Sequence, residues 1–155
     1  MATKGERTRT RMVETTLDLL QTRGYHGMGI AQVTAESGAP KGSVYFHFPG
    51  GKDDLVQAAL GQVGDEFVEL LEHGVDSGFS AAEVVGSIFD ILIDRNLASD
   101  FAAGCAVSSV VLDAAVDNEN LRLACSAVFD RWRSDIAAVL ERDGYRDSHS
   151  LADSV

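Results

Sequence analysis

Few of the features that mark secreted, membrane-bound or metal-dependent proteins occur in this sequence. Charges or glycines interrupt every apolar run after a few residues, so we expect no segment that crosses a membrane. The basic N-terminus is not followed by the apolar core of a secretory signal, and the expected location is therefore the cytoplasm. The only two cysteines, Cys105 and Cys125, form no CxxC pair. We interpret both as small buried apolar residues, with a redox sensor as the less favoured alternative.

β-strand alternation, internal repeats and low-complexity tracts are also missing, which leaves helical periodicity as the main pattern. Apolar residues recur at steps of three and four, and glycine or proline separates the runs that contain them. We therefore expect an all-α fold. The expected helices span residues 6–23, 30–37, from 40 or 41 to about 48, about 52–73, 81–97, about 104–115, and from 117 or 118 to 142.

Glycine, proline and capping residues mark the expected ends of these helices. Gly24 and Gly74 follow the first and fourth runs and are expected to end them. Pro40 suits the first turn of the third helix, because the N–H that proline lacks would have no partner there. Ser80 and Glu83 have the spacing of a capping box, the strongest start signal in the chain.

Charge is distributed unevenly along the chain, which has a net charge of −11. Residues 1–52 contain seven Lys and Arg against four Asp and Glu, whereas residues 53–155 contain six against twenty. A basic head on an acidic body indicates that only the head approaches a polyanion such as nucleic acid. Chance clustering on a solvated basic face is the alternative.

The pair Gly51-Lys52 suggests a nucleotide-binding P-loop, but the rest of that motif is absent. The first glycine of a P-loop would fall at Phe46, and the hydroxyl residue after the lysine would fall at Asp53. An aspartate at that position would repel phosphate. The sequence therefore disfavours nucleotide binding at this stretch.

Residues 30–48 have the length and the breaks of a helix-turn-helix, whose second helix enters the major groove of DNA. Val44 and Phe48 lie one turn apart and are expected to face the core. The residues left outside suit contacts to phosphates and base edges: Lys41, Gly42, Ser43, Tyr45 and His47. Lys52, at the start of the next helix, lies where an anion is favoured. For Tyr45 and His47, the edge of a small three-helix core is an open alternative.

Several segments resemble the tetracycline-repressor (TetR) family of transcriptional regulators. The first helix ends in RGYHG, the helix-turn-helix reads IAQVTAESGAPKGSVYFHF, and KDDL opens the long helix that follows. The recognition helix and the double glycine before Lys52 are similar to the LmrA/YxaF-like subgroup. A second segment, GCAVSSVVLDAAVDNENLRLACSAVFDRW, resembles the regulatory domain of that subgroup.

This resemblance implies a homodimer that binds double-stranded DNA at a palindromic operator and is a repressor released by a small molecule. It implies a DNA-binding domain at residues 6–66, with the helix-turn-helix at about 29–48, and a regulatory domain at 67–155. Lys41, Gly42 and Ser43 would face the groove, and Tyr45, His47 and Lys52 would bind phosphates. Further contacts would come from Gln32, Arg9 and Arg11.

The chain departs from the family pattern at two places. Met28-Gly29 replaces the Thr-Ser or Thr-Thr of other members, which removes a hydroxyl that caps the second helix. The resemblance also implies two further helices, which would form the dimer interface, beyond the terminal residues SHSLADSV. We therefore expect the C-terminal domain to be incomplete.

The body is the expected place for an apolar or aromatic effector, and four aromatic residues are candidates for lining its pocket: Phe67, Phe89, Phe101 and Trp132. The alternative for each of them is ordinary core packing. The four histidines are scattered singly, and no catalytic or metal-binding set stands out, so we expect neither enzymatic activity nor a cofactor. A helical ligand-binding or protein-interaction domain without operator binding is the alternative function.

Overall fold

The computed structural model describes residues 3–40 and 42–154, which form eight helices and, within those ranges, no strand. The all-α expectation is confirmed. No helix in this part of the chain is long and apolar enough to cross a membrane. The helices are α1 (Lys4–Gly27), α2 (Ile30–Ser37), α3 (Ser43–His47), α4 (Lys52–Asp76), α5 (Ala81–Ala98), α6 (Ala106–Asp113), α7 (Glu119–Arg142) and α8 (Ser148–Ala152).

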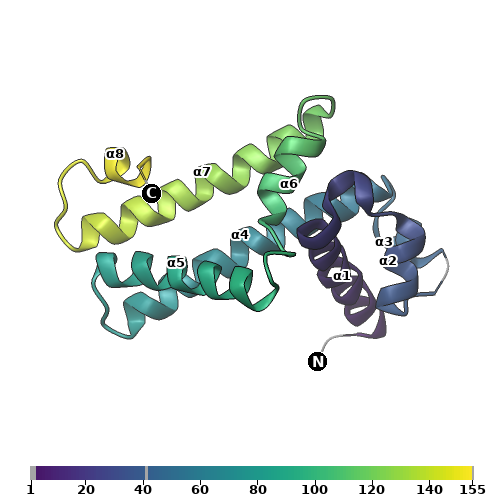
Figure 1. The fold of residues 1–155 in the computed structure, drawn as a ribbon, viewed down its shortest axis with the longest axis horizontal. Coiled ribbons are helices and arrows are strands. Elements are labelled where there is room, and N and C mark those ends of the chain that lie inside the picture. Colours follow the sequence, from purple (N-terminus) through teal and green to yellow (C-terminus); the bar gives the residue numbers. More distant parts are fainter. Residues whose placement is uncertain (1–2, 41, 155) are drawn as a thin grey trace.

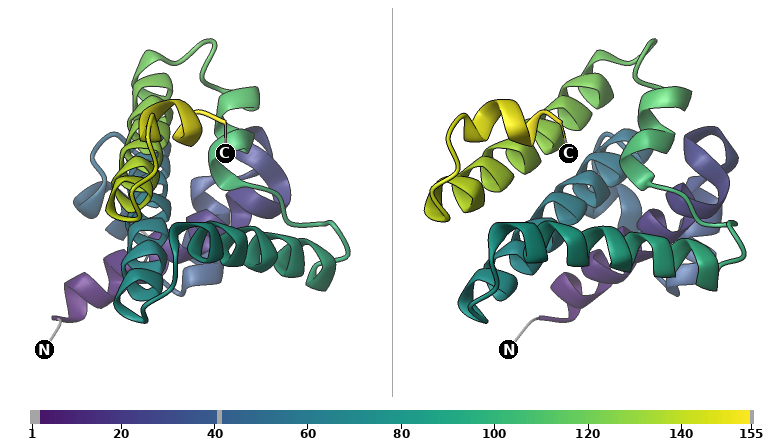
Figure 2. Two further views of the ribbon diagram at one scale, coloured as in Figure 1. Left: turned by 90° about the vertical axis from the view of Figure 1, so that its left-hand side faces the viewer. Right: turned by 60° about the vertical axis from the view of Figure 1, so that its left-hand side comes forward.

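The helices divide into a head, formed by α1 to α3, and a body, formed by α5 to α8 (Figure 1). Helix α4 starts in the head and runs into the body, where α7 lies along it (Figure 1, Figure 2). Helix α6 packs against α1, so the body also contacts the head directly. The first turn of α4 lies near the segment from α6 to α7, and we call this region, where the head meets the body, the joint.

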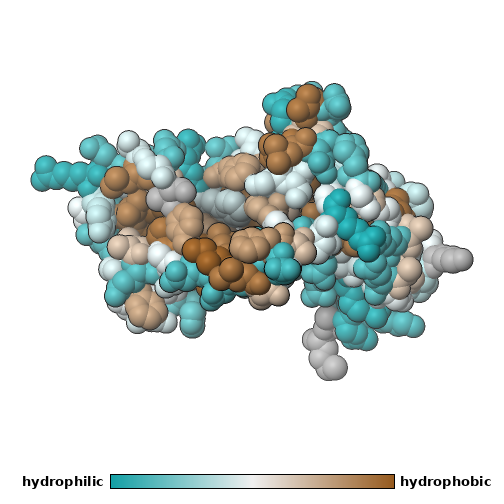
Figure 3. All heavy atoms as spheres, in the orientation of Figure 1, coloured by the Kyte–Doolittle hydropathy of each residue, from teal (hydrophilic) through white to brown (hydrophobic). Residues whose placement is uncertain are grey.

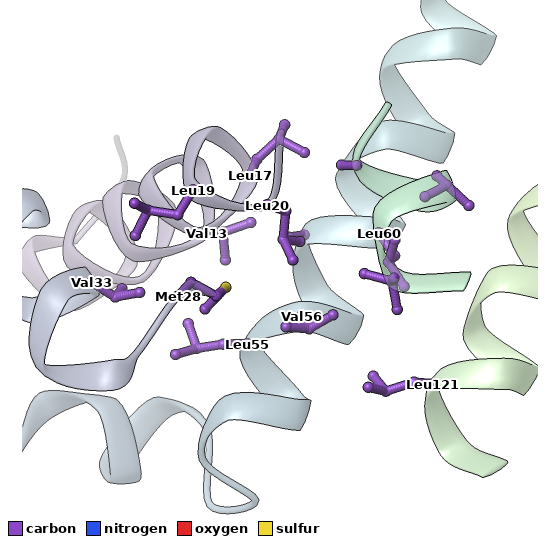
Figure 4. Close-up of a cluster of buried hydrophobic side chains, with 14 of the residues drawn as sticks. Val13, Leu17, Leu19, Leu20, Met28, Val33, Leu55, Val56, Leu60 and Leu121 are labelled. Atoms are coloured by element: carbon purple, nitrogen blue, oxygen red, sulfur yellow. The ribbon is translucent and has the colours of Figure 1, made fainter. Parts of the chain in front are cut away.

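One cluster of buried apolar side chains crosses this joint (Figure 4). Leu20 comes from α1, Leu55 and Leu60 come from α4, and Leu121 comes from α7; all four are fully buried. Each such side chain contributes roughly 1.5–3 kcal/mol by leaving water. The head is thus packed on side chains that also belong to the body.

A second cluster holds the far end of the body together. Leu71 of α4, Val84 and Ile88 of α5, and Leu140 of α7 are buried in it, and Ala152 of α8 packs against the same group. The two clusters lie at opposite ends of the α4–α7 pair. Helices α4 and α7 are therefore the two elements that contribute side chains to both clusters.

Several helix ends lie where local signals predicted them. The range predicted for α2, residues 30–37, is confirmed. The capping box is confirmed as well, since Glu83 N–H donates to Ser80 Oγ at 3.4 Å and Ser80 N–H donates to Glu83 Oε2 at 2.8 Å. Hydrogen bonds from the Ser80 hydroxyl and N–H lower the pKa of Glu83. Asn118 caps α7, with Leu121 N–H donating to its Oδ1 at 3.2 Å.

Of the two glycines predicted to end helices, one does so. At Gly24 the backbone leaves helical geometry (φ 69°, ψ 178°), which ends the regular helix at a kink before a last turn that continues to Gly27. Gly74 lies inside α4, which continues to Asp76. A Cβ atom on Gly74 would lie 2.7 Å from Val84 Cγ2, so glycine here permits close approach of α5.

The third and sixth helices are shorter than predicted. Gly42 is left-handed (φ 91°), so α3 starts at Ser43, and the prediction that Pro40 occupies its first turn is wrong. Pro40 instead lies in the turn before it, where its carbonyl accepts from Ser43 N–H at 3.0 Å. Helix α6 spans Ala106–Asp113, two residues less at each end than expected.

The substitution Gly74→Ala tests the close contact between α4 and α5. The added methyl group meets Val84, and overpacking of this kind costs about 1–3 kcal/mol of unfolding free energy. Urea denaturation followed by circular dichroism measures the change. Gly61→Ala is the matched control, because Gly61 lies in the same helix with no atom near its Cβ position, and alanine there should stabilise by about 0.5–1 kcal/mol. Equal effects at the two positions would contradict this account.

Candidate nucleic-acid interface

The α2–α3 unit is held on the head by three buried apolar side chains. Val33 of α2, Val44 of α3 and Phe48 after α3 are each at most 2% exposed and belong to the joint cluster. Gly38 ends α2 in the left-handed region (φ 64°), which turns the chain toward α3. The inward direction predicted for Val44 and Phe48 agrees with this burial.

The outer side of α3 carries two aromatic rings. Tyr45 is 61% exposed and Phe46 is 82% exposed, while Ser43 and His47 are half-buried. The ring of His47 lies edge-on to that of Phe46, with centroids 4.9 Å apart. Gly42 is exposed just before the helix, and Lys41 lies outside the described residues.

Phe46 is the exposed residue that sequence reasoning missed at this face. Its neighbours in the motif were assigned to the core or to DNA, but Phe46 itself was considered only as a mismatch to a P-loop. The spacing of Val44 and Phe48 could have revealed it, because a residue midway between two inward positions one turn apart lies on the opposite side of a helix. At 82% exposed, Phe46 is the most exposed of the large aromatic side chains in the described part of the chain.

Two arginines of α1 lie close to the helix-turn-helix. The guanidinium of Arg9 sits 5.1 Å from the centroid of the ring of Phe48, the residue that follows α3, in a cation–π contact. Arg11 reaches the turn after α2, since its Nη1 lies 3.9 Å from the position of a Cβ on Gly38. An open hollow of about 580 Å³ runs along the same helix, lined by Lys4, Arg7, Thr8, Thr10, Arg11 and Glu14.

Gln32 and Lys52, two further candidates for DNA contacts, are engaged within the chain. The Gln32 amide donates to Glu36 Oε1 at 2.8 Å along α2. The Lys52 ammonium lies 4.0 Å from the centroid of the Tyr25 ring, and burial lowers the pKa of Lys52, against the opposing effect of Asp53 and Asp113. Contact with an anion would have to compete with or add to these contacts, since the Gln32 amide has a second N–H and the Lys52 ammonium has three.

The first turn of α4 is built around Asp53. One carboxylate oxygen accepts from Tyr25 Oη and the other from Asn118 Nδ2, each at 2.7 Å. Sequence reasoning considered this aspartate only as a residue that repels phosphate. Its partners lie 28 and 65 positions away, so no local pattern indicated the role it has in the structure.

The four aromatic candidates for an effector pocket separate into two groups. Phe67 of α4 and Trp132 of α7 lie together, with ring centroids 5.0 Å apart. Among the described residues, the buried Trp132 Nε1 and Asp135 Oδ2 have no hydrogen-bond partner. Phe89 and Phe101 are exposed on the surface. Figure 3 shows an apolar patch over α5, a helix that carries several exposed large hydrophobic residues.

The cysteines differ from the expectation in one respect. Cys125 is buried, and burial raises the pKa of its thiol. Cys105 is exposed at the start of α6, so the prediction that both are buried is wrong for this residue. Of the neighbouring residues that suggested burial, Ala106 and Val107 are buried, whereas Ala102 is exposed.

Family models match most of the chain. Residues 12–59 match the model for bacterial regulatory proteins of the tetR family, and residues 81–155 match the C-terminal domain of LmrA/YxaF-like transcriptional regulators. The uncharacterized HTH-type transcriptional regulator Rv0196 of Mycobacterium tuberculosis is 34% identical over 84% of this chain and 67% of its own length. The HTH-type regulator LmrA of Bacillus subtilis is 28% identical over 92% of this chain and 76% of its own length.

Solved structures show the same fold. A TetR transcriptional regulator from Legionella pneumophila superimposes with a TM-score of 0.81 at 22% identity, over 99% of this chain and 81% of its own. A regulatory protein TetR from Rhodobacter sphaeroides gives a TM-score of 0.80 at 20% identity, over 94% of this chain and 80% of its own.

The alkaline titration of Tyr25 tests the joint at Asp53. Burial, reinforced by the hydrogen bond to Asp53, raises the pKa of Tyr25 from 10.0 to about 12. The pKa is higher in the folded state, so the stabilisation is complete below pH 10 and is lost as the pH rises toward about 12. Ultraviolet titration should show one late-ionising tyrosine. The variant Tyr25→Phe should lack this late titration step. The control Tyr145→Phe, at an exposed tyrosine of the body, should retain it. If the late step is lost in Tyr145→Phe and retained in Tyr25→Phe, the assignment to Tyr25 is refuted.

Proposed function

This chain belongs to the TetR family of transcriptional regulators, and from that premise we propose that it is a repressor that binds a palindromic operator and is released by a small apolar or aromatic effector. Its role as a DNA-binding transcriptional regulator follows from the family. The observation that supports the DNA-reading surface is that the exposed side of α3 belongs to the basic head, whereas most acidic residues lie in the remainder of the chain.

The proposed DNA-binding surface combines α3 with the flanking parts of α1, α2 and α4. The N-terminal end of α3 would enter the major groove, and the residues around it would bind phosphates. The role of Lys41 rests on the sequence alone. The full proposed set is Arg9, Arg11, Gln32, Lys41, Gly42, Ser43, Tyr45, His47 and Lys52, to which the structure adds Phe46.

Phe46 would make an apolar contact with the DNA. A phenylalanine left in water forgoes roughly 1.5–3 kcal/mol that burial would contribute, and a thymine methyl group in the major groove offers an apolar partner. The edge-on His47 ring fixes one side of Phe46, which limits the rotamers that binding must freeze. We therefore assign Phe46 to base readout, beside the groove-facing Lys41, Gly42 and Ser43, and assign phosphate contacts to Tyr45, His47 and Lys52.

Binding to DNA has to compete with contacts inside the chain. Gln32 would leave Glu36, and Lys52 would leave the ring of Tyr25, to meet the backbone. Such a cation–π contact is worth about 0.5–2 kcal/mol, whereas phosphate contacts also release counterions from DNA. Affinity should therefore fall as salt rises.

The two parts of the chain would have different functions. We assign DNA binding to residues 6–66, with the helix-turn-helix at about 29–48, and regulation to residues 67–155. The protein would act as a homodimer in the cytoplasm, where the chromosome lies, with its two recognition helices about 34–36 Å apart to match one turn of DNA. No enzymatic step is part of this proposal.

The effector would bind beside Phe67 and Trp132. Their rings already pack together, and Phe129 lies edge-on to Trp132 with a centroid distance of 5.5 Å. The indole N–H of Trp132, which has no hydrogen-bond partner among the described residues, would donate to an acceptor on the effector. Asp135, whose Oδ2 lies 3.9 Å from Arg131 Nε, would accept from a donor on it. Phe89 and Phe101, the other two proposed lining residues, are exposed.

Phe46→Ala tests the DNA-reading surface. Selection from random duplexes with the wild-type chain should enrich a palindrome, and the variant should bind that palindrome about tenfold to a hundredfold more weakly, because an apolar base contact is lost. The salt dependence of binding should stay unchanged, since no phosphate contact is removed.

Phe101→Ala is the matched control, because this ring is also exposed, at 72%, but lies in the body. Its affinity should equal that of the wild-type chain. Equal affinity of Phe46→Ala and the wild-type chain would refute base readout by Phe46. Enrichment of no palindrome by the wild-type chain would refute the operator proposal itself.

A further inference from the structure

Three segments of the chain meet on the carboxylate of Asp53. Tyr25 comes from the last turns of α1, and Asn118 comes from the N-cap of α7; each donates to a different oxygen of Asp53 at 2.7 Å. The head and the body are therefore joined by a hydrogen-bonded network in addition to the shared apolar cluster. Hydrogen bonds to a charged acceptor are stronger than those between neutral groups.

Asn118 cannot change position without changing the start of α7. Its Oδ1 accepts from Leu121 N–H at 3.2 Å, and its own N–H donates to the carbonyl of Ala114 at 3.0 Å. Leu121 is fully buried in the joint cluster. The side-chain amide of Asn118, which donates to Asp53, would therefore move together with the turn between α6 and α7.

Helix α6 is itself fastened to the end of α1. Gly104 N–H donates to the carbonyl of Gln21 at 2.8 Å, and His26 Nε2 lies 2.7 Å from the carbonyl oxygen of Asp113. Gly24 leaves room for Asp113, because a Cβ there would lie 2.5 Å from Asp113 Oδ2. A shift of α6 would therefore reach both the end of α1 and the turn that carries Asn118.

On its other side, the first turn of α4 touches the recognition helix. Gly51, which precedes Lys52, is buried, and the position of a Cβ on it lies 3.4 Å from Tyr45 Cε1 and 3.5 Å from Ile30 Cδ1. Movement of this turn would shift the ring of Tyr45 and the Lys52 ammonium, which rests over Tyr25. Both Tyr45 and Lys52 belong to the proposed DNA-binding surface.

We propose that Asn118 is a positioning residue for DNA binding: through Asp53 it fixes the first turn of α4, and so sets Lys52 and Tyr45 in the geometry that fits the operator. This inference rests on the proposed DNA-binding surface. When the turn between α6 and α7 moves, the Asn118 amide leaves Asp53, and the first turn of α4 loses its attachment to the body.

Substitutions at Asn118 can separate its contact with Asp53 from its role as a helix cap. Asn118→Ser keeps a capping oxygen but is too short to reach Asp53, and it should bind the duplex selected by the wild-type chain about tenfold more weakly. Asn118→Asp also keeps the cap but sets a second carboxylate against Asp53, and it should bind more weakly still. The double variant Asp53→Asn with Asn118→Asp exchanges donor and acceptor. It should recover to within about threefold of the wild-type affinity, because Asn at 53 can donate to Asp at 118 and still accept from Tyr25.

Asn120→Asp is the matched control for charge, since this exposed residue lies two positions further along α7. It adds the same negative charge without touching Asp53, and its affinity should stay within about twofold of the wild type. Wild-type affinity in both Asn118 variants would overturn the inference. So would a double variant as weak as Asn118→Asp. If Asn118→Asp fails to fold, Asn118→Ser and the double variant carry the comparison.

A measurement without DNA distinguishes this inference from the proposed function. In Asn118→Ser, the backbone amide resonances of Gly51 and Tyr45 should shift, and in Asn120→Asp they should not. If the wild-type chain selects no duplex but these resonances shift, operator binding is refuted, while the link from Asn118 to the first turn of α4 is retained. Unchanged resonances in Asn118→Ser overturn the positioning role, whatever the DNA selection gives.

Discussion

The packing of α4 against both halves of the molecule is the constraint on which the rest of the structure depends. Leu55 and Val56 at its start are fully buried with the head, and Leu71 near its end is buried in the body. Helix α3 is only five residues long and could not persist by itself, since isolated helices of this length are unstable in water. The recognition helix therefore takes its position from a core that α4 supplies.

Because that core is shared, the two halves of the protein are energetically linked. Leu121 of α7 lies in the same cluster as Val33 and Val44 of the helix-turn-helix, and the Asp53 network adds polar contacts at the same place. Under our proposal, a ligand that alters the α6–α7 segment would change the free energy of the DNA-binding geometry, and DNA would act on that segment by an equal amount. A mobile linker between two independent domains would not provide this coupling.

The fold was predictable from sequence where local signals decide it. The ends of α2 and the cap at Ser80 were correct, and Asn118 is one of the two residues, 117 and 118, predicted to start α7; a capping side chain acts within three residues of its own position. Gly74 misled the prediction, because a glycine that admits Val84 from another helix looks the same in sequence as one that ends a helix. Of the candidate site, the exposure of Tyr45 was foreseeable from helix geometry, and that of Phe46 could have been. The pairing of Asp53 with Asn118, 65 positions apart, could not, since nothing in the local sequence specifies it.

Amide hydrogen exchange of α6, with and without the selected duplex, tests the coupling between head and body most directly. Residues 106–113 would not touch DNA, but they pack on α1 and lead to Asn118. If DNA binding stabilises the joint, these amides should exchange more slowly in the complex, together with those of α1 to α3. Protection confined to α1, α2 and α3, with α6 exchanging at the rate of the free protein, would contradict the account.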